Sequence, residues 1–124
     1  MNGHMNEGRY GQIFSDAAEG IMAMVGADEE YVARGMSYFT VETTVKYLAE
    51  THAGERVVVE TDVTEGAGKK LRCLHTMKRK SDGEVMATCD QLMLHVSLET
   101  RRTCEPPEDV AERVAKLAAL SEEA

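Results

Sequence analysis

The first residues of the chain hold its densest cluster of side chains that could do chemistry. Residues 2–7 combine two asparagines with His4 and Glu7, directly before an amphipathic stretch. If a helix begins here, its unpaired N–H groups and the positive end of its dipole favour a carbonyl oxygen or an oxyanion. His4 and Asn6 could contact that oxygen, while Glu7 could act as general base on a water molecule. The structural alternative is a capping asparagine, a dipole-complementing Glu7 and a histidine in a tail.

A long helix must position that cluster. Apolar residues recur at three- and four-residue spacing from Tyr10 to Val25, so we expect one amphipathic helix over residues 6–25. Its small residues suit close packing against a sheet. Gly26 would end this helix, and residues 28–34 can form one further short turn.

From residue 37 the pattern changes to the alternation of apolar and polar residues that is typical of strands. We expect four long strands up to residue 98, joined by short polar turns as an antiparallel meander. Pro106 and Pro107 would stop the last strand, and an acidic first turn then begins a C-terminal helix. The order indicates the α+β class, with the long helix packed on a single antiparallel sheet of at least four strands.

Composition limits the function classes. The chain has 124 residues and a formal net charge of −8, which favours one soluble domain over residues 1–124 and disfavours nucleic acid. No apolar run approaches the roughly 20 residues of a membrane-spanning helix, so we expect no membrane partner. The sequence does not open with the basic and apolar regions that are typical of a signal peptide, and three widely spaced cysteines favour a reducing compartment. We therefore expect a cytoplasmic protein.

Residues 3–10 resemble a family motif. The run Gly-His-Met-Asn-Glu-Gly-Arg-Tyr is similar to Asp-x-x-Gly-His-x-Asn-Asn-x-x-Tyr, the motif of hotdog-fold acyl-CoA thioesterases of the 4-hydroxybenzoyl-CoA thioesterase-like superfamily. Gly3, His4, Asn6 and Tyr10 match position by position, while Glu7 stands where a second asparagine is commonest. The resemblance covers nearly the whole chain, and it is nearest to the betainyl-CoA thioesterases of carnitine breakdown.

The aspartate of that motif would fall one residue before Met1, and the family's first strand would precede it. We expect both to lie upstream of Met1, so that this form is N-terminally shortened relative to the family; a natural short form is the alternative. Without that aspartate, the resemblance makes Glu7 the catalytic carboxylate, with Asp16 in reserve.

The resemblance implies a hotdog fold and a homodimer or tetramer of dimers, with the active site at the dimer interface. It implies hydrolysis of a small acyl-CoA without a metal or other cofactor. A water molecule would attack the thioester carbonyl, while His4, Asn6 and the first helical N–H groups hold the oxygen.

Binding such a substrate needs two further groups of side chains. A betainyl group would need aromatic faces for its quaternary ammonium, and ordinary core positions are the alternative for these rings. The aromatic candidates are Tyr10, Phe14, Tyr38 and Phe39. The phosphates of coenzyme A would need cations, and the basic stretch over residues 69–102 can supply them, if it is not simply solvated surface. The candidates there are Lys69, Lys70, Arg72, Arg101 and Arg102.

Other interpretations stay open. His75 would lie opposite Cys89 on paired strands, which permits a zinc site or a Cys–His nucleophile pair, although neither CxxC nor HxxxH spacing is present. Cysteines packed as small apolar side chains also fit. A non-catalytic module that binds acyl-CoA is the main alternative to an enzyme. A hydratase of the same fold would want an Asp–His pair in the loop before the helix, and the sequence has none there.

Overall fold

The structure is a computed structural model, and it describes residues 7–50, 52 and 54–123. Its elements follow one another as α1 (Glu7–Val25), α2 (Glu29–Ala33), β1 (Met36–Tyr47), β2 (Val57–Ala67), β3 (Lys70–Arg79), β4 (Val85–Ser97), β5 (Arg102–Thr103) and α3 (Glu108–Glu123). The two long helices, the short turn and the four long strands lie close to their predicted positions. The two-residue strand β5 was not predicted.

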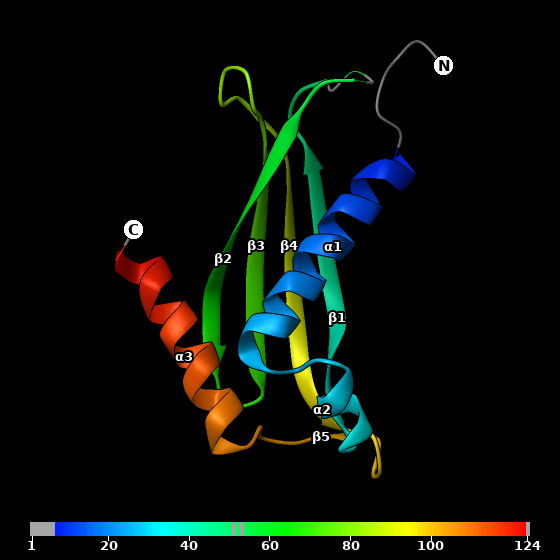
Figure 1. Cartoon of the computed structure of the whole chain (residues 1–124), viewed down its shortest axis with the longest axis vertical. Coiled ribbons are helices and arrows are strands. Elements are labelled where there is room, and N and C mark those ends of the chain that lie inside the picture. Colours follow the sequence, from blue (N-terminus) through cyan, green and yellow to red (C-terminus); the bar gives the residue numbers. More distant parts are fainter. Residues whose placement is uncertain (1–6, 51, 53, 124) are drawn as a thin grey trace.

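The order of the strands corrects the predicted meander. Within the described residues the strands form one antiparallel five-stranded sheet, in the order β1-β4-β3-β2, with β5 beside β4. Strands β2, β3 and β4 do form a meander, but β1 pairs with β4 and lies on the far side of the sheet from β2 (Figure 1). The prediction was wrong because β1 ends at Tyr47 and β2 begins only at Val57, a separation too long for a tight hairpin, so these consecutive strands need not pair.

Helix α1 lies across one face of this sheet (Figure 1). Near its beginning, Tyr10 and Phe14 pack with Met77 and Met86 from the sheet. Near its end, Ile21 and Val25 join a second buried cluster with other sheet residues and α3. Burying one large apolar side chain contributes about 1.5–3 kcal/mol, so the two clusters fix both ends of α1 against the strands.

Helix α3 lies beside β2 at one edge of the sheet (Figure 1). Gly66 permits this close approach, because a Cβ atom there would lie 2.5 Å from Cγ1 of Val114. At the opposite edge, β1 has no further strand beside it among the described residues. This open edge exposes large apolar side chains, including Phe39 and Val41. None of the helices in the described part of the chain is long and apolar enough to cross a membrane.

Candidate functional site

The start of α1 coincides with the cluster predicted to do chemistry. The helix begins at Glu7, and the first N–H groups of any helix lack partners within it. These groups and the positive end of the dipole can stabilise negative charge on an oxygen atom. His4, Asn6 and the side chain of Glu7 lie outside what the structure describes, so their roles stay predictions.

A cavity of about 230 Å³ lies between the first half of α1 and strands β1 and β4. It is lined by Tyr10, Gly11, Phe14 and Ser15 of α1, Thr43, Val45 and Tyr47 of β1, and Cys89 and Gln91 of β4. Because a helical turn takes 3.6 residues, Tyr10 lies about one turn after Glu7. The cavity therefore begins about one helical turn from the start of α1.

Three aromatic side chains contribute to the lining of this cavity. The rings of Tyr10 and Tyr47 meet edge to face, with their centroids 5.0 Å apart, and Phe14 lies one helical turn further along. The structure thus brings two predicted aromatic residues, Tyr10 and Phe14, together at one site. Sequence reasoning missed Tyr47, although the alternation that places Val45 and Tyr47 on one face of β1 was visible.

The other two predicted aromatic residues do not line the cavity. Tyr38 is buried in the second core cluster, where its ring lies 5.0 Å from that of His95. Phe39, the next residue in the strand, points to the opposite face and is 52% exposed.

A chain of hydrogen bonds reaches the cavity from within the sheet. Fully buried His75 places its Nδ1 atom 2.8 Å from Oγ1 of Thr61 and its Nε2 atom 2.8 Å from Oε1 of Gln91. Burial lowers the pKa of His75 below its ordinary value, and the hydrogen bond to Gln91 opposes that shift only in part. A neutral imidazole has one donor and one acceptor. In the arrangement shown, Nε2–H therefore donates to Gln91 and the Thr61 hydroxyl donates to Nδ1.

The cysteines beside this histidine have the properties of buried thiols. His75 does pair with Cys89 across β3 and β4, as predicted. Burial raises the pKa of Cys89, and it raises the pKa of Cys73 to about 12. Both ring nitrogens of His75 already have other partners, which disfavours a Cys89–His75 nucleophile pair. Among the described residues, no three His, Cys, Asp or Glu side chains come together as a metal site would need.

A second buried histidine, His95 of β4, belongs to a separate network. Its Nδ1–H donates to the carbonyl oxygen of Cys104, 2.9 Å away, so Nε2 accepts the hydroxyl of Tyr31. This network lies near α2, away from the cavity.

The predicted cations gather at the start of β3 and around β5. Lys70 and Arg72 both lie within 4.0 Å of Glu65, and Nη1 of Arg72 is 3.1 Å from Asp90. Lys69, Arg101 and Arg102 are exposed. Since β3 has ten residues that rise about 3.3 Å each, this group lies roughly 30 Å from the strand's other end.

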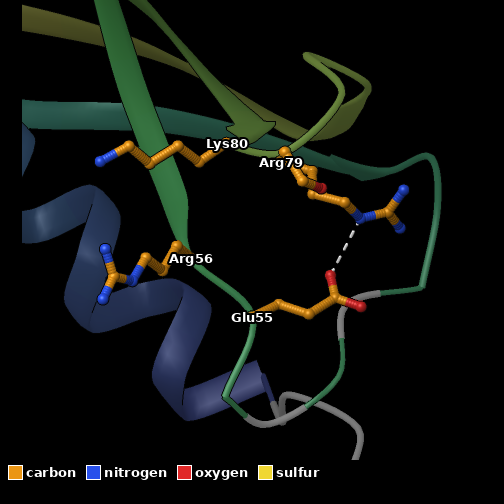
Figure 2. A pocket seen from close by; sticks show the side chains of 5 residues that line it. Glu55, Arg56, Arg79 and Lys80 are labelled. Atoms are coloured by element: carbon orange, nitrogen blue, oxygen red, sulfur yellow. Dashed lines mark hydrogen bonds and ion pairs between the residues drawn. The ribbon is translucent and has the colours of Figure 1, made fainter.

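A second cavity, of about 400 Å³ and lined mainly by basic residues, lies at that other end of β3. It is lined by Glu55, Arg56, Arg79, Lys80 and Ser81 (Figure 2). Arg79 is held by carboxylates, at 3.0 Å from Glu55 and also by Asp82 and Glu84. Arg56 and Lys80 point together away from the Glu55–Arg79 pair (Figure 2). Sequence reasoning missed Arg56 because it precedes the basic stretch.

Three comparisons with known proteins bear on this site. A family model described as the thioesterase-like superfamily matches residues 1–114. The L-carnitine dehydrogenase/betainyl-CoA thioesterase of Ruegeria pomeroyi is 42% identical over 117 residues, which are 94% of this chain and 24% of that protein. The betainyl-CoA thioesterase of Pseudomonas aeruginosa is 35% identical over 118 residues, 94% of this chain and 74% of that protein. The chain therefore spans about a quarter of the first relative and about three quarters of the second.

Among solved structures, a hypothetical protein of Staphylococcus aureus in complex with CoA has a similar backbone. Its TM-score is 0.90 at 25% sequence identity, and the match covers 96% of this chain and 75% of that chain.

Proposed function

The chain belongs to the thioesterase-like superfamily and has the hotdog fold, and we propose that it hydrolyses a small acyl-CoA, with betainyl-CoA as its substrate. One observation carries the proposal: an aromatic cavity of about 230 Å³ begins one turn from the start of α1. A site for a thioester carbonyl and a pocket for a small acyl group are thereby adjacent.

In the proposed reaction, Glu7 takes a proton from a water molecule whose oxygen attacks the thioester carbonyl. The N–H groups at the start of α1, with Asn6 and His4, hold the oxyanion that develops. The C–S bond then breaks, and the proton passes to the departing thiolate. The products are the free carboxylic acid and coenzyme A. We propose that no metal or other cofactor takes part.

The lining of the cavity supports a cationic acyl group. A quaternary ammonium gains about 0.5–2 kcal/mol over an aromatic face, and here Tyr10, Phe14 and Tyr47 supply such faces. The relatives named as betainyl-CoA thioesterases point to the same substrate.

Two groups of cations could bind the phosphates of coenzyme A. The group predicted from sequence comprises Lys69, Lys70, Arg72, Arg101 and Arg102. Arg56 and Lys80 lie at the opposite end of β3, where Tyr10 of α1 meets Tyr47. We favour Arg56 and Lys80 because they lie at the same end of the sheet as the proposed thioester site. Within the described residues neither of them forms an ion pair, so both charges are available.

We also propose that two copies of the chain pair through β1, with the active site at the interface between them. The open edge of β1 and its exposed apolar side chains support this assembly, because such an edge in a monomer invites further pairing. Light scattering coupled to size exclusion would give twice or eight times the mass of one chain for the dimer or the tetramer of dimers.

The experiment is the release of free CoA thiol from betainyl-, acetyl-, 4-hydroxybenzoyl- and long-chain acyl-CoA. We expect betainyl-CoA to be hydrolysed fastest. The Glu7→Gln variant should lose on the order of a hundredfold in kcat/KM. Asp16→Asn tests the carboxylate held in reserve. Because Asp16 is exposed on α1 and accepts a hydrogen bond from Gln12, we expect this variant to keep its activity; a loss as large as that of Glu7→Gln would transfer the catalytic role to Asp16. Tight CoA binding without hydrolysis of any thioester would instead indicate a non-catalytic acyl-CoA-binding module.

A further inference from the structure

Gln91 is the one amide side chain in the lining of the aromatic cavity. It projects from the middle of β4, between Thr43 of β1 and Cys73 of β3, on the sheet face that α1 covers. Its Oε1 atom is occupied by His75, at 2.8 Å. Within the described part of the chain, no hydrogen bond uses the amide nitrogen of Gln91. One end of the amide is thus fixed in the sheet, and the other is available to a ligand.

His75 and Thr61 decide which end faces the cavity. In the arrangement shown, the Thr61 hydroxyl donates to Nδ1 and Nε2–H donates to Oε1 of Gln91, so the cavity meets the amide N–H₂ group. In the reverse arrangement, Nδ1–H donates to Oγ1 of Thr61, and the Gln91 amide donates to Nε2. Oε1 then faces the cavity. Both arrangements preserve both hydrogen bonds, because a hydroxyl and a neutral imidazole can each donate or accept.

The two arrangements suit different acyl groups. An amide N–H₂ carries partial positive charge and repels a quaternary ammonium, whereas an amide oxygen attracts one. Turning the amide needs only a change of His75 tautomer and a rotation of the Thr61 hydroxyl. Nothing in the buried sheet need move, and no charge is created in it.

We propose that Gln91 determines specificity for a cationic acyl group, by turning its amide oxygen toward the trimethylammonium while His75 and Thr61 exchange donor and acceptor roles. This rests on the proposed function. In this account Gln91 contacts the substrate, whereas His75 and Thr61 are positioning residues that act through it.

The test compares betainyl-CoA with tert-butylacetyl-CoA, its uncharged analogue of the same shape. Wild type should prefer the cationic substrate. Gln91→Met should lower kcat/KM for betainyl-CoA on the order of tenfold and change that for the analogue little. Gln91→Glu, which offers only acceptor oxygens when ionised, should keep the preference for the cation. Gln12→Met, at an exposed position on α1, controls for the same change elsewhere and should match wild type.

The positioning residues need a separate comparison. Thr61→Val would leave Nδ1–H of the reverse arrangement buried without an acceptor, so it should reduce the preference for betainyl-CoA; Thr61→Ser, which keeps the hydroxyl, should restore it. The ring nitrogen shifts of His75 in NMR spectra should report protonation at Nε2 in the free protein. With a thioether analogue of betainyl-CoA bound, they should report protonation at Nδ1.

Each outcome has one meaning. Equal losses on both substrates in Gln91→Met, or loss of the preference in Gln91→Glu as well, would overturn the role of Gln91. An unchanged preference in Thr61→Val would overturn the exchange of roles. Hydrolysis of neither substrate by wild type would instead count against the proposed function itself.

Discussion

Two buried tyrosines differ in whether the hydroxyl has a hydrogen-bond partner. Replacing each tyrosine with phenylalanine should therefore affect the stability of the protein differently. The hydroxyl of Tyr38 is buried and makes no hydrogen bond to any residue that the structure describes, whereas that of Tyr31 donates to His95. Tyr38→Phe should therefore leave the free energy of unfolding unchanged or raise it by up to about 1 kcal/mol. Tyr31→Phe should lower it by about 1–3 kcal/mol, because it leaves Nε2 of His95 unpaired. Urea denaturation of both variants measures this, and equal destabilisation would contradict the assigned partners.

The residues of the candidate site show how far sequence reasoning reaches. Tyr10 and Phe14 could be predicted because one helix carries them at four-residue spacing. Tyr47 and Gln91 come from strands far along the chain, and they meet α1 only through the register of β1 with β4. Since a shift of one residue would turn Gln91 to the other face, no local pattern could assign it to the cavity.

Among the elements, the helices and strands were predictable, but the partner of β1 was not. Helical spacing and strand alternation are local, so they predicted both bounds of α1 and the beginning of β1 to within one residue. The pairing of β1 with β4 depends on where residues 48–56 carry the chain. The two buried clusters under α1 join sheet residues to opposite ends of the helix. Such contacts span most of the sequence and leave no signal in a short window.

The packing of α3 against β2 predicts a strong effect at Gly66. A Cβ atom there would lie 2.5 Å from Cγ1 of Val114 and 3.1 Å from that residue's carbonyl oxygen, so α3 would have to move. Gly66→Ala should lower the free energy of unfolding by about 1–3 kcal/mol.

Gly20→Ala is the matched control, because a Cβ atom at this position in α1 would meet no described residue within 4 Å apart from its chain neighbours and the helix's own backbone. It should raise the free energy of unfolding by about 0.5–1 kcal/mol. Chemical denaturation of both variants tests the contact, and a neutral Gly66→Ala would contradict it.

For the whole molecule, two buried histidines predict how stability depends on pH. Burial lowers the pKa of both His75 and His95 from 6.5, so the native state binds their protons less readily than the unfolded chain. The two neutral histidines contribute fully to the free energy of unfolding above pH 6.5. This contribution is lost progressively as the pH falls from the pKa of the unfolded chain toward that of the native state.

The free energy of unfolding should fall with decreasing pH by at most about 1.4 kcal/mol per pH unit for each histidine. Urea denaturation between pH 7.5 and about 5, above the range of ordinary carboxyl groups, measures it. His75→Gln should reduce the slope by removing one of the two groups. A flat profile over this range would contradict the neutral, buried state of both histidines.

The two groups of cations lie at opposite ends of the sheet, and this predicts a difference in coenzyme A recognition. Substituting both Arg56 and Lys80 with alanine should raise the KM for an acyl-CoA about tenfold, because contacts with phosphate are lost. The same pair should leave the KM for an acyl-pantetheine unchanged, since that substrate has no phosphate. As the control, substituting both Arg101 and Arg102 with alanine should change neither the KM for the acyl-CoA nor the KM for the acyl-pantetheine. If the Arg101 and Arg102 variant raised the KM for the acyl-CoA and the Arg56 and Lys80 variant did not, the phosphates would instead bind to the cations predicted from sequence.

In the proposed complex, the acyl group of the thioester lies in the aromatic cavity beside the start of α1. A crystal structure with a thioether analogue of betainyl-CoA tests this most directly. We predict density for the trimethylammonium among Tyr10, Tyr47 and Gln91, with the sulfur near the first N–H groups of α1. Density for the acyl group anywhere else, for example beside His95 near α2, would contradict the account.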